Sequence, residues 1–156
     1  VRPDLQFAEL RGNIDSRLSK IPDGGAIVMA VAALDILGLT DRIAETLAVD
    51  EFVPAVGQGC VAVECRTDDA ATGEVVAAID HRITRHGVEV ERAFLAELGS
   101  GCSLPVGAHV ADGRLWTFLA DLDTGISVSD EIELPGGVAD LDVARAAARA
   151  ARETLT

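Results

Sequence analysis

Three basic side chains in the first twenty residues have a spacing suited to binding an anion. Arg11 follows a short apolar run at an expected strand-to-helix turn, while Arg17 and Lys20 are three residues apart and share a helical face. Turns that follow strands in α/β folds bind ligands, and the amides at helix N-termini accept carboxylate or phosphate groups. The pattern predicts an anion clamp. The alternative is a solvated basic helix face, balanced by Glu9 and Asp15.

A second candidate site is Gln58, which lies between Gly57 and Gly59 in a stretch punctuated by proline and glycine. The two glycines allow a ligand to approach the backbone closely, and the Gln58 amide can both donate and accept hydrogen bonds. The stretch lacks the lysine and serine of a phosphate-binding loop. Two interpretations are open: Gln58 and Gly59 contact a ligand, or the stretch is only a tight turn or a crossover between domains.

A third candidate is the thiol of Cys102, which lies between Gly101 and Ser103 after one expected helix and before an expected strand. An accessible thiol there can be modified, whereas the alternative is a small buried hydrophobic residue. Cys60 and Cys65 lie in an apolar, strand-like context. An odd set of three cysteines fits a reducing cytoplasm better than a disulfide framework. The cysteines and histidines are too dispersed to predict a metal site.

The first half of the chain alternates between expected strands and helices. Strands are expected at 5–10, 26–30 and 61–65, and helices from Ile14 (with Asn13 as its N-cap), over 31–37 and over 40–47. Such alternation indicates an α/β fold, here an α/β fragment with few strands.

The second half indicates a small α+β domain. Apolar spacing predicts two helices between Asp68 and Leu98, then strands at 106–110, 116–122 and 126–134, and a final helix over 141–155. Asp112-Gly113 is a strong hairpin signal. We expect a three-stranded antiparallel sheet with helices on one face.

The composition excludes several functional classes. The chain has 26 acidic and 13 basic residues, a net charge of −13 and one tryptophan, which argues against nucleic-acid binding. The longest apolar run, 26–34, is too short to span a membrane, and no signal peptide is visible. Because an acidic chain repels anions at long range, a bound anion needs local arginines.

Several short motifs are individually weak but specific in combination, because their order and spacing match one family over essentially the whole chain. They are RPDL at 2–5, LRGN at 10–13, RLSK at 17–20, LGL at 37–39, PAVGQG at 54–59, VECR at 63–66, ERAFL at 91–95, GC at 101–102 and PVG at 105–107. In these motifs the chain resembles the porphobilinogen deaminase, or hydroxymethylbilane synthase, family.

The resemblance implies a cytoplasmic transferase of porphyrin and heme biosynthesis. Such an enzyme condenses four porphobilinogen molecules into the tetrapyrrole hydroxymethylbilane and releases ammonia. Its dipyrromethane cofactor is held by a thioether to a cysteine that matches Cys102. Arginines matching Arg11 and Arg17 bind the cofactor and substrate carboxylates, and the position of Gln58 and Gly59 lies at the same cleft. Each pyrrole carries acetate and propionate groups, to which bidentate arginine is suited.

The resemblance also implies three domains in a protein about twice this length. We therefore expect 1–52 to be the C-terminal part of the second, periplasmic-binding-protein-like domain. Residues 53–66 would be a crossover to an absent first domain, either poorly anchored or paired with another chain, and 67–156 the cofactor-carrying domain.

The family's catalytic aspartate would lie upstream, so that no catalytic residue is expected in this chain. We expect the isolated chain to be inactive, with Cys102 free of cofactor and self-association through the surface that the absent domain would cover. The alternative is a non-catalytic anion-binding or interaction module derived from the same fold.

Overall fold

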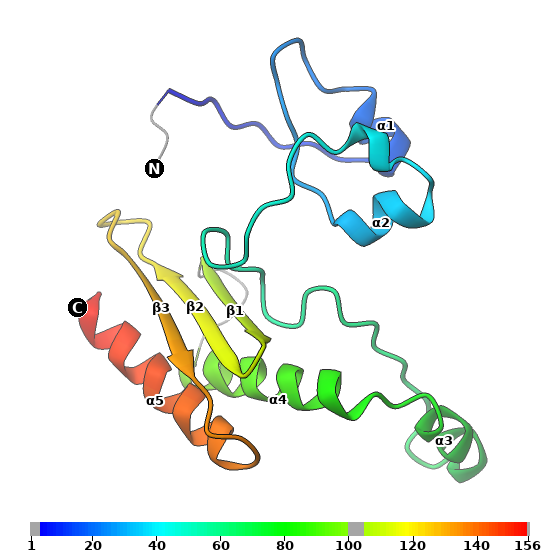
Figure 1. Cartoon of the computed structure of the whole chain (residues 1–156), viewed down its shortest axis with the longest axis vertical. Coiled ribbons are helices and arrows are strands. Elements are labelled where there is room, and N and C mark those ends of the chain that lie inside the picture. The colour runs from blue at the N-terminus through cyan, green and yellow to red at the C-terminus, as the bar shows by residue number, and fades with distance from the viewer. Residues whose placement is uncertain (1–3, 100–104, 156) are drawn as a thin grey trace. The chain divides into compact units, whose positions relative to one another are not determined.

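The computed structural model describes residues 4–99 and 105–155 and divides the chain into two compact units, Val1–Ala44 (unit 1) and Glu45–Thr156 (unit 2). Figure 1 labels the elements. Unit 1 contains the helices α1 (Ile14–Leu18) and α2 (Val31–Ile36) and the 3-10 helix η1 (Thr40–Arg42). Unit 2 contains α3 (Ala70–Ala77), α4 (Arg82–Glu97), β1 (Val106–Ala111), β2 (Arg114–Ala120), β3 (Ser127–Glu133) and α5 (Ala139–Thr154).

Unit 2 is built on an antiparallel sheet with the strand order β1-β2-β3. In its register Ala108 lies opposite Thr117, and Leu119 lies opposite Val128. Helices α4 and α5 pack against each other on one face of this sheet (Figure 1). The structure thus confirms the expected α+β fold with helices on one face.

The core of unit 2 lies between that sheet face and the two helices. Val90 and Phe94 of α4 and Leu115 of β2 are fully buried, as are Ala144 and Ala148 of α5. Alanine at these α5 positions leaves room for α4 to approach closely, which accounts for the dense contact between the helices. The core therefore fixes the positions of α4 and β1.

The β1–β2 hairpin turns at Asp112-Gly113, as expected. Both residues have positive φ angles, 49° and 72°. Two positive φ angles are typical of a two-residue turn whose twist matches that of the flanking strands. This turn fixes the register of β1, on which the site described below depends.

In unit 1 the two expected strands are not formed, so this part of the sequence-based prediction is wrong. Residues 5–10 and 26–30 are extended but belong to no sheet. A strand is stabilised by hydrogen bonds to a neighbouring strand, and within residues 4–44 neither segment pairs with another. The alternation of extended segments with helices remains, consistent with an α/β fragment.

The short helices of unit 1 follow their local signals. The side chain of Asn13 accepts a hydrogen bond from the Ser16 amide at 2.9 Å and begins α1. Gly38, with φ at +67°, follows the end of α2. The helix expected over 40–47 is reduced to the single turn η1, which has no side-chain cap and no buried residue to stabilise it.

The segment 53–66 differs from expectation in both halves. Its first half is anchored rather than loose, because the Ala108 amide donates to the Pro54 carbonyl at 3.0 Å. A Cβ at Gly107 would lie 2.8 Å from the Val53 carbonyl oxygen, so this close approach requires glycine. The strand expected at 61–65 is absent and those residues are exposed, because no neighbouring strand pairs with them in the described part of unit 2. Across residues 4–99 and 105–155, no helix is long and apolar enough to cross a membrane.

Candidate functional site

The turn that carries Arg11 in unit 1 is closed by its own neighbours. Gly12 has a φ of +136°, and a Cβ there would lie 2.9 Å from the Ser16 hydroxyl. The ammonium group of Lys20 donates to the Arg11 carbonyl at 3.1 Å. Lys20 therefore stabilises the turn through the Arg11 backbone. It was expected to bind an anion together with Arg11 and Arg17, and the structure gives it this structural contact instead.

Arg11 and Arg17 differ in their surroundings. The Arg11 guanidinium is almost fully exposed and pairs with Glu9 at 3.1 Å, a contact that contributes little free energy in water. Arg17 is half-buried, and its Nε is buried without a hydrogen-bond partner among the described residues. A buried donor without a partner is costly, so this group is suited to a carboxylate ligand.

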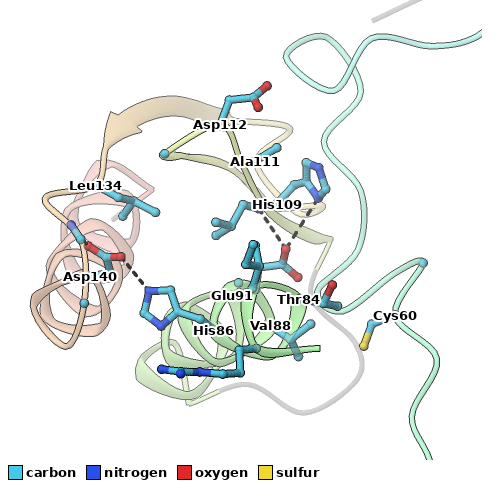
Figure 2. Close-up of a pocket in the computed structure, with 18 of the residues that line it drawn as sticks. Cys60, Thr84, His86, Val88, Glu91, His109, Ala111, Asp112, Leu134 and Asp140 are labelled. Atoms are coloured by element: carbon cyan, nitrogen blue, oxygen red, sulfur yellow. Dashed lines mark hydrogen bonds and ion pairs between the residues drawn. The ribbon is translucent and has the colours of Figure 1, made fainter. Parts of the chain in front are cut away.

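Unit 2 contains a pocket of about 870 Å³. Its lining comes from the turn after Pro54, the first half of α4, the β1–β2 hairpin and the loop before α5 (Figure 2). The polar side chains that line it are those of Gln58, Arg82, Thr84, His86, Glu91, His109, Asp112 and Asp140, together with the thiol of Cys60. Gln58 and Gly59, predicted from the sequence as a ligand-contacting pair, are thus both at this pocket.

Glu91 connects two walls of the pocket. Only 5% of its surface is exposed. One carboxylate oxygen accepts from the Gly57 amide at 2.7 Å and the other accepts from the Val110 amide at 2.9 Å. His109 Nδ1 lies 3.6 Å from the second oxygen, and its ring stacks on Trp116. Figure 2 shows the carboxylate directed at the β1 backbone and His109.

A second buried carboxylate, Asp140, lies at another part of the lining. It accepts from His86 Nε2 at 2.8 Å and from the Gly136 amide at 2.6 Å. This arrangement joins α4 to the start of α5 and orients the His86 ring, as Figure 2 shows. Within the described residues no cluster of histidine, cysteine and carboxylate side chains could hold a metal ion.

Asp121 performs a structural role at the β2–β3 turn. The backbone amides of Asp123 and Thr124 donate to its carboxylate and lower its pKa below the usual value. A carboxylate held in its ionised form in this way is unsuited to act as a general acid near neutral pH.

The predicted site residues thus fall into three groups. Arg11 and Arg17 belong to unit 1, Gln58 and Gly59 line the pocket of unit 2, and Cys102 lies outside the described residues. In the sequence analysis, Glu91 was named only as the first residue of the ERAFL motif. Its position three residues before Phe94 places it on the buried helix face, a signal that could have marked it as an unusual buried charge.

The comparisons with known proteins identify the family. Residues 1–74 match the family model described as "Porphobilinogen deaminase, dipyromethane cofactor binding domain". Residues 86–154 match "Porphobilinogen deaminase, C-terminal domain". The chain belongs to the porphobilinogen deaminase family. The family predicted from the sequence motifs is therefore confirmed, and the first matched model is that of the cofactor-binding domain.

A curated relative is the porphobilinogen deaminase of Nitratidesulfovibrio vulgaris (strain DP4). It is 47% identical over 129 residues, which cover 78% of this chain and 41% of the relative. The chain therefore spans less than half the length of this relative.

The two family models meet at the pocket. Gly57, Gln58 and Gly59 lie in the region matched by the cofactor-binding domain, whereas Glu91 and Val110 lie in the region matched by the C-terminal domain. The last part of the first matched region, residues 45–74, and the whole second matched region both belong to unit 2. The hydrogen bond from Gly57 to Glu91 thus joins two family regions within one compact unit.

Proposed function

We propose that this chain functions as part of a porphobilinogen deaminase, the enzyme that condenses four porphobilinogen molecules into hydroxymethylbilane and releases ammonia. The observation that carries the proposal is the match of both family models, in order, to residues 1–74 and 86–154. The orphaned Nε of Arg17 supports a ligand with carboxylate oxygens, which every porphobilinogen-derived pyrrole carries.

Within this function, Arg11 and Arg17 bind pyrrole carboxylates. Arg11 is exposed and available to a ligand, and Arg17 offers the unpartnered buried donor. Gln58 contacts the ligand through its amide, next to the freely accessible backbone of Gly59. In unit 1, the exposed guanidinium of Arg11 and the unpartnered Nε of Arg17 fit a ligand with carboxylate groups.

Cys102 is the proposed attachment residue for dipyrromethane, which when bound supplies the pyrrole chain that is extended. In the isolated 156-residue chain we expect Cys102 to carry no cofactor, because Arg11 and Arg17 alone hold a pyrrole too weakly for stable attachment of the dipyrromethane. Intact-mass measurement should give the unmodified mass near 16.2 kDa. A mass increase of two pyrrole units at Cys102 would contradict the free thiol, and attachment at Cys60 or Cys65 would contradict the residue assignment.

The cytoplasm is the proposed compartment. Cys60 and Cys65 are both free thiols in the structure, and Cys65 is exposed. Free exposed thiols persist in reducing compartments.

Self-association is proposed on the basis of exposed apolar side chains, which favour burial against another surface. Phe7, Ile36, Val61 and Ile83 are each more than three-quarters exposed. Light scattering should show species heavier than 16.2 kDa that dissociate on dilution. A strictly monomeric chain at all concentrations would contradict this.

Porphobilinogen binding to the isolated chain tests the proposed site. Titration followed by amide NMR should shift signals near Arg17 and Gln58. The Arg17→Gln variant should bind about 10- to 100-fold more weakly, because a charge-assisted hydrogen bond is lost. Arg145→Gln is the matched control, since Arg145 pairs with Asp142 on α5. Equal affinity of Arg17→Gln and the unsubstituted chain would overturn the assignment.

Turnover is tested separately by ammonia release from porphobilinogen. We expect none from the 156-residue chain, because none of its residues matches the acidic residue that the family uses for proton transfer. Positioned acid or base groups typically contribute about 10²- to 10⁴-fold to a rate. Steady ammonia release by the purified chain would contradict this expectation.

A further inference from the structure

Glu91 is a buried charge without an arginine or lysine partner among the described residues. A buried carboxylate is tolerated only when hydrogen bonds replace the water that it has lost. Here the replacement comes from the backbone, because both oxygens accept amide hydrogens. Because the Glu91 carboxylate accepts from the backbone amides of Gly57 and Val110, it also holds these two segments together.

The two donors belong to segments far apart in the sequence. Gly57 lies 34 residues before Glu91, and Val110 lies 19 residues after it. Glutamine could not replace Glu91 without loss, because its NH₂ group would face one of the two amide donors. The arrangement therefore requires a carboxylate and joins the Gly57 backbone to the edge of β1.

The turn that follows Gly57 is tight and ends in the pocket. The Gln58 amide donates to the Ala55 carbonyl at 3.0 Å, and the Cys60 amide donates to the Gly57 carbonyl at 3.2 Å. Val56 packs on the core of unit 2, while Gln58 and Gly59 remain exposed. The turn is thus fixed just before the two residues that are free to meet a ligand.

We propose that Glu91 is the positioning residue for Gln58 and Gly59. Its carboxylate holds the Gly57 backbone against β1. It thereby determines the position of the Gln58 side chain and of the Gly59 backbone at the pocket. The role for ligand binding rests on the proposed function, whereas the anchoring of the turn is independent of it. In this role Glu91 acts through the backbone of the turn.

Hydrogen exchange of the Gly57 amide in the full chain tests the anchoring. In the Glu91→Gln variant, the amide hydrogen that faces the new NH₂ group, that of Gly57 or that of Val110, should exchange about 10- to 100-fold faster. The exchange rates of the core amides of α5 should change much less. Ala148→Gly is the control, because Ala148 is fully buried in α5, outside the two segments that carry the donors. It should weaken the core and speed exchange of the α5 core amides at least as much as that of Gly57.

The unsubstituted chain gives a test that does not depend on any variant folding. A scalar coupling across the hydrogen bond should link the Gly57 amide nitrogen to the side-chain carboxylate carbon of Glu91. Absence of that coupling, or Gly57 and Val110 exchange in Glu91→Gln within twofold of the unsubstituted chain, would overturn the anchoring.

Porphobilinogen titration then separates anchoring from binding. The apparent affinity reported by the Gln58 and Gly59 amides should fall about tenfold in Glu91→Gln and stay unchanged in Ala148→Gly. If porphobilinogen leaves these amides unmoved in the unsubstituted chain, the proposed function of the pocket fails, and the exchange result still decides the anchoring. Faster Gly57 exchange with unchanged affinity would overturn the positioning role.

Discussion

The two units differ in where their apolar side chains lie. In unit 2, Phe94 and Leu115 are completely buried, whereas in unit 1 Phe7 is 86% exposed and Ile36 is 84% exposed. Among the described residues of unit 1, Leu34 alone is buried. Most of the hydrophobic stabilisation therefore lies in unit 2. The proposed carboxylate-binding arginines stand on the unit with the smaller core, so their arrangement depends more on local hydrogen bonds and on a ligand.

The largest expected effect comes from emptying the core of unit 2. Phe94→Ala should lower the free energy of unfolding by about 3–5 kcal/mol. Trp116, the single tryptophan, lies in β2 and reports unfolding of this unit by fluorescence. Amide signals of α1 should remain unchanged. Their simultaneous loss would show that the two units depend on one core.

Leu34→Ala makes the corresponding change in unit 1. Removal of this buried side chain should cost about 2 kcal/mol or more locally and loosen α2. Carbon chemical shifts of Val31–Ile36 should move toward coil values. The midpoint of the Trp116 transition should stay the same, and a shifted midpoint would break the contrast between the units.

Gly107→Ala tests how firmly unit 2 holds its incoming segment. The added methyl group would lie 2.8 Å from the Val53 carbonyl oxygen and 3.0 Å from that of Pro54, so the segment must move. We expect a loss of about 1–2 kcal/mol. The Ala108 amide should exchange faster, because its bond to Pro54 lengthens. Unchanged exchange would mean that the segment adapts without cost.

The smallest expected effect distinguishes α3 from α1 by pH, because the cap of α3 is a carboxylate and the cap of α1 is an amide. Asp69 caps α3 through the amide and hydroxyl of Thr72, and these hydrogen bonds lower its pKa below the usual 3.8. A lowered folded pKa means that the stabilisation is present above the unfolded pKa and is lost as pH falls through the folded value.

Helix α3 should therefore fray as the pH falls below about 3.8. Helix α1 should not respond through its cap, because Asn13 carries no titrating group. Amide shifts of Ala70–Ala77 and Ile14–Leu18 recorded across this range provide the measurement. The Asp69→Asn variant should abolish the difference.

Local signals in the sequence predicted the elements that close on themselves. Asn13 before α1, Gly38 after α2 and the Asp112-Gly113 turn are examples, because each depends on residues within a few positions. The strand at 26–30 was predicted wrongly since a strand also needs a partner, which apolar composition does not supply.

The site follows the same rule. Residue type and spacing left Gln58 and Gly59 open between ligand contact and a turn or crossover, and the family resemblance assigned them to the cleft; they line the pocket. The hydrogen bonds of Glu91 were not predicted, because they connect residues 34 and 19 positions apart whose proximity only the folded sheet creates.

The contacts along β1 also bear on how copies of this chain avoid forming continuous sheets. The outer amides of β1 at Ala108 and Val110 are already occupied by Pro54 and Glu91, so no incoming strand can pair there. At the opposite edge, β3 carries Asp130 and Glu133, which would face like charges on a second copy, whereas its Glu131 pairs with Arg114. One edge of the sheet is therefore blocked by hydrogen bonds and the other by repulsion, which protects the sheet from strand-by-strand aggregation.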